Sequence, residues 1–151
     1  MKINWKKLLI CLAIPLAVGG LGALLSGGMR DYGAMVKPPF SPPGWVFPVV
    51  WSILYLLMGY ASYRVLETGS TKPLILYGLQ LFANFVWPLL FFGGGWFLLS
   101  FFWLIALWVP IYLTIRAFSK VDETAGNLLI PYILWVTFAA YLNFGIYLLN
   151  P

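Results

Sequence analysis

The chain has 151 residues, of which 62% are hydrophobic and 9% are charged, and its formal net charge is +5. With a mean hydropathy of +0.91, this composition excludes an ordinary soluble domain and predicts an integral membrane protein. The positive charge does not indicate a nucleic-acid partner, because the lysines and arginines fall mainly in the gaps between apolar stretches, where they orient membrane proteins.

Five apolar stretches of near-membrane-crossing length occupy most of the sequence. A helix needs roughly 20 mostly apolar residues to cross ~30 Å of hydrocarbon, whereas barrel strands would be shorter and would alternate in polarity. The predicted spans are Leu8 to Leu25, Val46 to Val65, Pro73 to Phe92, Trp96 to Ile115 and Leu128 to Leu149. Because most connections between them are short, we expect one all-α membrane domain over residues 1–151, an antiparallel up-and-down bundle of five transmembrane helices.

The first span follows three lysines and so resembles a secretory signal peptide. Its apolar run is long for a signal sequence, which favours a retained membrane helix. The lone Cys11 lies within this span, so neither a disulfide framework nor a cysteine metal cluster is expected. Gly19 and Ala23, small residues four positions apart, predict the close approach of a neighbouring helix.

The connection from Ser26 to Gly44 is longer than the others. Its part from Lys37 to Gly44 contains four prolines, which fix φ and favour extended backbone in the residues before them. A long, stiffened loop at one mouth of a bundle predicts a lid over a ligand site. A rigid connector without a ligand role is the alternative, and the sequence leaves both open.

Five spans place the two ends of the chain on opposite sides of the membrane, so the basic residues of each side can be counted. The side of the N-terminus carries seven of them, Lys2, Lys6, Lys7, Arg64, Lys72, Arg116 and Lys120. The other side carries two, Arg30 and Lys37. By the positive-inside rule, we expect the N-terminus in the cytoplasm and the C-terminus outside, in a bacterial plasma membrane.

Apart from Arg64, next to the end of the second span, charged residues are absent from the predicted spans. The chain has no histidine, and its acidic residues Asp31, Glu67, Asp122 and Glu123 all lie outside the spans. Proton relays, ion-coupled pumps and metal-ligated catalytic sites usually need such groups within the membrane. No metal or cofactor is therefore expected, and recognition must depend on aromatic rings and neutral hydrogen-bonding groups.

Aromatic residues make up 19% of the chain and include eight tryptophans. Trp5, Trp45 and Trp96 lie at span ends, which predicts positions at the membrane interfaces. Trp103 and Trp108 lie in a stretch without polar companions, which favours packing against lipid.

Helical spacing groups the other polar and aromatic side chains of interest into three faces. These faces are Trp51 with Tyr55, Asn84 with Trp87 and Phe91, and Trp135 with Ala139 and Asn143. An unbonded amide in hydrocarbon is costly, so we expect both asparagines to face the bundle interior. The faces would then line a hollow suited to a flat, largely apolar aromatic guest, or they would fill the core against one another.

The most specific sequence patterns lie in three blocks, Lys37 to Tyr60, Asn84 to Gly93 and Pro131 to Asn143. In these blocks, in their order and spacing, the chain resembles the tryptophan-rich sensory protein / peripheral-type benzodiazepine receptor family, also called translocator proteins, as a bacterial member. The resemblance extends over nearly the whole chain.

This resemblance implies a five-helix membrane fold, commonly a homodimer, with a ligand cavity closed by the loop between the first two helices. It implies binding of porphyrins such as protoporphyrin IX and of benzodiazepine- and isoquinoline-type ligands. The residues that match the family's cavity positions are Tyr32, Pro42, Trp51, Tyr55, Asn84, Trp87, Phe91, Trp135, Ala139 and Asn143. Sterol binding is not expected, because no basic residue follows Tyr147 as the sterol pattern of the last helix requires.

Three functions stay open at this point. The first is a receptor or sensor that binds a tetrapyrrole. The second is light- and oxygen-dependent porphyrin degradation, for which the resemblance assigns the indoles of Trp51 and Trp135. The third is passive transport of a porphyrin or another apolar molecule, which the lack of charge within the spans does not oppose.

Overall fold

The computed structural model describes residues 2–27 and 32–150, and over these residues it is helical, with no strand. The long helices are α1 (Trp5–Leu25), α2 (Val46–Glu67), α3 (Pro73–Pro88), α4 (Phe97–Val121) and α6 (Ile130–Leu149). A short helix, α5 (Glu123–Leu128), precedes α6, the 3-10 turn η1 covers Tyr32–Ala34, and the π-helical turn η2 covers Leu89–Gly93. Five helical segments, counting α3 with η2 and α5 with α6, are long and apolar enough to cross a membrane. The predicted fold class, an all-α membrane protein with five spans, is confirmed, and the antiparallel arrangement is consistent with it.

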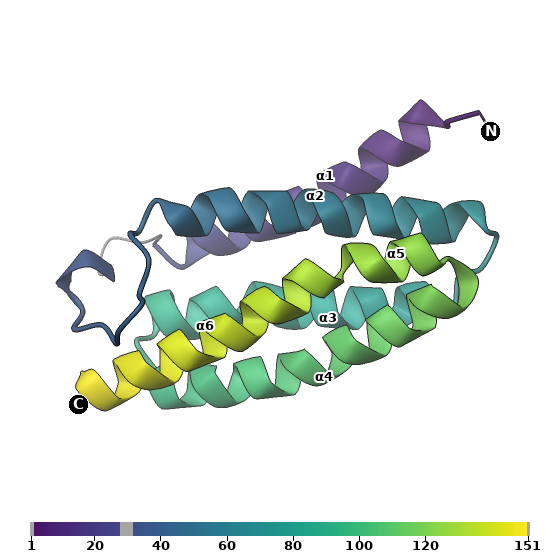
Figure 1. Cartoon of the computed structure of the whole chain (residues 1–151). Helices are drawn as coiled ribbons and strands as arrows, with labels where there is room; N and C mark the ends of the chain where they lie inside the picture. The colour runs from purple at the N-terminus through teal and green to yellow at the C-terminus, as the bar shows by residue number, and fades with distance from the viewer. Residues whose placement is uncertain (1, 28–31, 151) are drawn as a thin grey trace.

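The helices lie side by side along one long axis, with the two ends of the chain at opposite ends of the bundle (Figure 1). Around the bundle, α1 packs on α2 and α3, α3 packs on α4, and α4 packs on α6. Consecutive helices were expected to be neighbours, but α2 and α3 have little contact because α1 lies against both. On the remaining side of the bundle, aromatic side chains of α2 pack against aromatic side chains of α6.

Local sequence signals explain where several helices begin and end. The Asn4 side chain accepts a hydrogen bond from the Lys7 backbone N–H at 3.1 Å and starts α1 three residues before the predicted span. Asp122 caps α5 in the same way through Ala125 N–H at 3.0 Å. Pro88 ends α3, and the π-helical turn η2 follows it directly. A π turn changes the direction of its side chains relative to a regular α-helix, and here these include the rings of Phe91 and Phe92.

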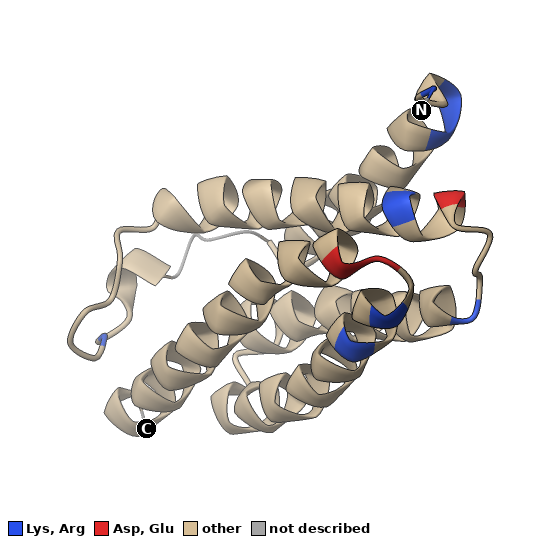
Figure 2. Cartoon of the chain, turned by 45° about the vertical axis from the view of Figure 1, so that its right-hand side comes forward, with Lys and Arg blue, Asp and Glu red and all other residues tan. Residues whose placement is uncertain are grey.

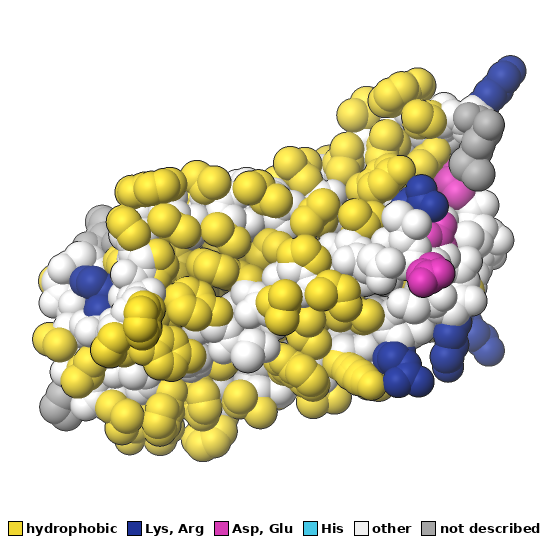
Figure 3. Space-filling model, in the orientation of Figure 1, with side chains coloured by type: hydrophobic (Ala, Val, Ile, Leu, Met, Phe, Trp, Pro, Cys, Tyr) yellow, Lys and Arg dark blue, Asp and Glu magenta, His cyan; other side chains and the backbone are white. Residues whose placement is uncertain are grey.

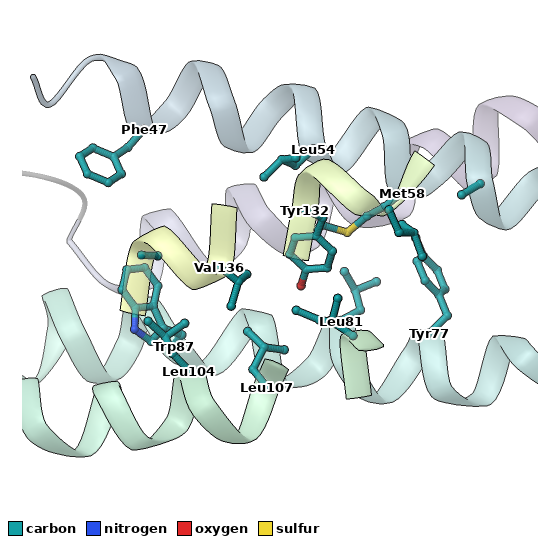
Figure 4. Packing of buried hydrophobic residues seen from close by; sticks show 14 of the residues in the cluster. Phe47, Leu54, Met58, Tyr77, Leu81, Trp87, Leu104, Leu107, Tyr132 and Val136 are labelled. Carbon is teal, nitrogen blue, oxygen red and sulfur yellow. The ribbon is translucent and has the colours of Figure 1, made fainter. Parts of the chain in front are cut away.

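The core lies between α2, α3, α4 and α6. Figure 4 shows its labelled members, among them Met58 from α2, Leu107 from α4 and Val136 from α6; these three side chains are no more than 1% exposed. In contrast, α1 buries only Cys11, Pro15 and Gly22. Most of α1 therefore faces away from the core.

The face of the bundle seen in Figure 3 is apolar along much of its length, and charge gathers mainly at one end (Figures 2 and 3). Trp5, Trp45 and Trp96 lie at helix ends and are 64%, 69% and 59% exposed, as their predicted interfacial role requires. The expectation of lipid-facing packing was wrong for Trp103, which packs against the core and donates from Nε1 to the Ala83 carbonyl at 2.6 Å.

Candidate ligand site

A cavity of about 300 Å³ lies between α1, α2 and α3, in the half of the bundle nearest the loop 26–44. The predicted residues Trp51, Tyr55, Asn84 and Trp87 all line it. Its complete lining is Leu16, Gly19, Gly20, Ala23, Ser26, Phe47, Pro48, Trp51, Ser52, Tyr55, Asn84, Trp87, Pro88 and Phe92. No charged side chain is among them, so the wall is built from rings, aliphatic groups and neutral polar groups.

The wall formed by α1 is a part of the site that helical spacing did not assign. A Cβ atom at Gly19 would overlap the Tyr55 ring, whereas one at Gly20 would meet nothing within 4 Å. Gly19 thus lets the Tyr55 ring lie against α1, and Gly20 leaves the cavity open. The spacing of Gly19 and Ala23 predicted a close approach, but not that part of this face would border a hollow.

A chain of hydrogen bonds connects the cavity wall to the core. The Tyr55 hydroxyl donates to Asn84 Oδ1 at 2.8 Å, and Asn84 Nδ2 donates to the Tyr132 hydroxyl at 2.8 Å. Tyr132 donates in turn to Gln80 Oε1 at 2.6 Å. Asn84 faces inward as predicted, being 3% exposed, and the chain fixes its amide. Sequence reasoning missed Gln80 and Tyr132, although a glutamine within an apolar span is a signal for such a bond.

The second predicted amide, Asn143, is 1% exposed and holds helices together. Its Oδ1 accepts from Trp87 Nε1 and from the Ser100 hydroxyl, each at 3.0 Å, and its Nδ2 donates to the Phe97 carbonyl at 2.7 Å. These bonds tie α6 to α3 and α4. With three protein partners, Asn143 has little capacity left for a ligand.

Five predicted residues, Tyr32, Trp87, Phe91, Ala139 and Asn143, gather around a second and much smaller hollow of about 20 Å³. A space of this size holds about one water molecule. The ten predicted residues therefore do not surround a single hollow. The rings of Phe47, Trp87 and Phe92 border both spaces and lie between them.

Trp135 lines neither of these two spaces, but it contacts the cavity wall. Its ring centroid lies 6.5 Å from that of Trp51, with the planes at 88°, and 5.7 Å from that of Phe47. The indole Nε1 is buried and has no hydrogen-bond partner among the described residues. An unpaired buried N–H is unusual, and it leaves a donor directly behind the cavity wall.

The loop between α1 and α2 is tied to the bundle at several points. Pro42, a predicted site residue, accepts a hydrogen bond through its carbonyl from the Tyr32 hydroxyl at 2.7 Å, and burial raises the pKa of this phenol. Asn150, at the end of α6, exchanges two hydrogen bonds with the backbone of Val36 at 3.1 and 2.8 Å. The Tyr32 ring packs edge-on against Phe47 at 5.0 Å. The described part of the loop thus lies over the mouth of the bundle beside the cavity.

Comparison with known proteins agrees with this architecture. A model of the TspO/MBR family matches residues 11–149. The chain is 41% identical to the tryptophan-rich protein TspO of Chlorobaculum tepidum, over 95% of this chain and 96% of that protein. It is 37% identical to the tryptophan-rich sensory protein of Cereibacter sphaeroides, over 99% and 95% of the two chains. It is 38% identical to the translocator protein of Ovis aries, over 87% and 82%. The chain is an integral membrane protein that belongs to the TspO/MBR family.

Proposed function

We propose that this chain is a membrane receptor or sensor that binds a flat, largely apolar aromatic ligand of the porphyrin or isoquinoline and benzodiazepine type. The observation that carries the proposal is the cavity between α1, α2 and α3, whose wall combines the rings of Trp51, Tyr55 and Trp87 with neutral polar groups. Its volume of about 300 Å³ is at the lower end of the usual range for ligand pockets. A tetrapyrrole would therefore enter it edge-on and extend through its opening.

The hydrogen-bond chain defines the polarity that such a ligand meets. The Tyr55 hydroxyl uses its hydrogen atom in the bond to Asn84, so its oxygen offers the cavity an acceptor. The Ser26 hydroxyl likewise donates to the Ala23 carbonyl at 3.0 Å. A ligand that carries an N–H or O–H donor at its edge complements these oxygens.

Binding is tested by titrating the purified protein with protoporphyrin IX and following the quenching of tryptophan fluorescence. The informative variant is Gly20→Leu, because a Cβ atom at Gly20 meets nothing within 4 Å and the longer side chain would occupy the cavity that Gly20 borders. We expect affinity to fall at least about tenfold. The matched control is Gly78→Leu, since Gly78 also faces open space but does not line this cavity. Equal affinity in wild type and Gly20→Leu would refute the site.

A second candidate function, porphyrin degradation in light and oxygen, is favoured by the perpendicular contact of Trp51 and Trp135. Indoles at this distance can intercept reactive products of an excited porphyrin. The test is to illuminate the complex in air and follow porphyrin absorbance in wild type, Trp51→Phe and Trp135→Phe. Porphyrin loss that depends on these indoles supports degradation, and binding with unchanged porphyrin supports the receptor alone.

We also infer that the end of the bundle carrying Lys6, Lys72 and Lys120 faces the cytoplasm and that the chain forms a homodimer. The orientation is inferred from the excess of basic residues at that end (Figure 2), and the homodimer is inferred from membership of the family. The orientation is tested by treating intact cells that carry Lys2→Cys or Asn150→Cys with an impermeant thiol reagent, and only Asn150→Cys should react.

A further inference from the structure

A second large cavity lies between the same three helices at the opposite end of the bundle. Its volume is about 630 Å³, about twice that of the candidate ligand site. The wall is mostly apolar and includes Ile10 and Ile14 of α1, Leu66 of α2, and Leu74 and Leu81 of α3. Nothing in the proposed receptor function uses this space.

The rim of this cavity is basic. Lys6 and Lys7 both border it. Lys7 Nζ is neutralised by Glu67 Oε1 at 2.9 Å, but Lys6 is exposed and has no carboxylate partner among residues 2–27 and 32–150. The rim therefore presents one uncompensated positive charge above an apolar hollow.

A polar group without a partner lies on the wall. Tyr77 is 7% exposed and borders the cavity, and its hydroxyl has no hydrogen-bond partner within the described part of the chain. The hydroxyl of the neighbouring wall residue Ser62 donates to the Gly59 carbonyl at 2.8 Å, so Ser62 does not donate to Tyr77 and can offer it only an acceptor. A buried hydroxyl that lacks a partner is costly in an apolar setting, and a ligand with polar ester groups would relieve this cost.

We propose that this cavity binds an anionic phospholipid, with an acyl chain along the apolar wall and the phosphate beside Lys6. Cavities between membrane helices with a basic rim bind anionic lipid head groups. The occupant must be amphipathic, because the wall is apolar and the rim is charged. A polar ester near the head group of such a lipid can accept from Tyr77.

A second copy of the chain fits this surface less well. A two-fold interface brings the same patch of both subunits together, so the uncompensated Lys6 of one copy would approach that of the other. Like charges brought together on a partly desolvated surface repel. Charge complementarity therefore favours the anionic lipid.

The test measures lipid binding to the full chain by native mass spectrometry, with phosphatidylglycerol and phosphatidylcholine of the same acyl chains. We expect wild type to bind the anionic lipid more tightly. Gly78→Leu enters open space at the cavity wall and should lose both lipids. Lys6→Gln should retain lipid but lose about fivefold in its preference for phosphatidylglycerol. Because Lys6 is exposed, this variant keeps the test valid if Gly78→Leu is poorly folded.

Two controls separate this site from the receptor site. Gly20→Leu fills the other cavity, and Lys120→Gln removes a charge that does not border this one; both should bind lipid as wild type does. Gly78→Leu should still bind protoporphyrin IX, so failure of one proposal leaves the other intact. Unchanged lipid binding in Gly78→Leu, no preference for the anionic head group in wild type, or loss of a dimer instead of lipid in Gly78→Leu would overturn the proposal.

Discussion

Both α1 and α6 are apolar helices of membrane-spanning length, but they are packed in different ways. Six residues of α6 are buried, including Tyr132 and Asn143, and their hydrogen bonds tie α6 to α3 and α4. Only Cys11, Pro15 and Gly22 of α1 are buried, and both large cavities lie along α1. In a membrane, apolar side chains gain little by leaving lipid. The helices with amides and hydroxyls are therefore bound tightly, and the aliphatic helix leaves space.

We call the side of the bundle formed by α1 the open side and the side formed by α6 the packed side. On the open side α1 is held closely against α2 at Gly59, and disruption of this contact should have the largest effect on stability. A Cβ atom at Gly59 would lie 2.6 Å from the Cys11 carbonyl oxygen and 2.7 Å from Leu12 Cα. Gly59→Leu must push the α1 backbone away. We expect the free energy of unfolding to fall by about 3 kcal/mol, measured by detergent denaturation in mixed micelles. Gly20→Ala, which meets no atom within 4 Å, is the control; a near-native Gly59→Leu would show that α1 is not held there.

The packed side is tested at Asn143. Asn143→Leu removes the acceptor of Trp87 Nε1 and Ser100 Oγ and the donor to the Phe97 carbonyl. With about 0.6 kcal/mol for each hydrogen bond within a membrane, we expect a loss near 2 kcal/mol in the same denaturation assay. Ser100→Ala removes one of these bonds and should cost roughly a third as much. Equal costs for the two variants would contradict this additivity, because the loss of one bond would then cost as much as the loss of all three.

The two tyrosines of the hydrogen-bond chain distinguish binding from packing. Tyr55 borders the cavity, whereas Tyr132 is 1% exposed and borders none of the three cavities described above. Tyr55→Phe should weaken protoporphyrin IX binding about fivefold to tenfold through loss of the acceptor, and should lower stability by only about 0.6 kcal/mol through loss of its one bond to Asn84. Tyr132→Phe should instead lower stability by about 1 kcal/mol. If Tyr132→Phe weakened binding and Tyr55→Phe did not, the polar group that contacts the ligand would lie in the core and not at the cavity wall.

The sequence predicts the packed side better than the open side. The spacing of Asn84 and Asn143 is enough to turn both amides inward, because an unbonded amide in lipid is costly. Which amide borders a cavity depends on distances between helices that spacing along one helix does not contain. The aliphatic α1 has no polar residue in its middle to orient it, so neither its position between α2 and α3 nor its role in the site follows from periodicity. The break between α5 and α6 at Leu129 also has no hydropathy signal.

The loop connects the two sides, because it begins at α1 and is tied to the end of α6. Asn150→Ala removes the two hydrogen bonds to Val36. We expect amide exchange at Val36 to quicken about threefold to fivefold, since about 0.6–1 kcal/mol of local stability is lost. Global unfolding should hardly change. If exchange at Val36 stays at the wild-type rate, the loop is a rigid connector held by its prolines and not a lid held at α6.

The charged end offers the smallest effect and a direct comparison of two ion pairs. Lys7 joins Glu67 from the open side, whereas Asp122 accepts from Arg64 at 3.2 Å and also from Ala125 N–H at 3.0 Å. Partial burial opposes ionisation of Asp122, but these hydrogen bonds outweigh it and lower its pKa. A lowered pKa in the folded state adds stability that is complete above the ordinary value of 3.8 and is lost as the pH falls below it.

Asp122→Asn keeps the cap and removes the charge, so its stability should depend less on pH between about 5 and 2 than that of wild type. Identical pH profiles would mean that water screens the Arg64 pair as fully as an exposed one, and the corner between α4 and α5 would then be held by the cap alone.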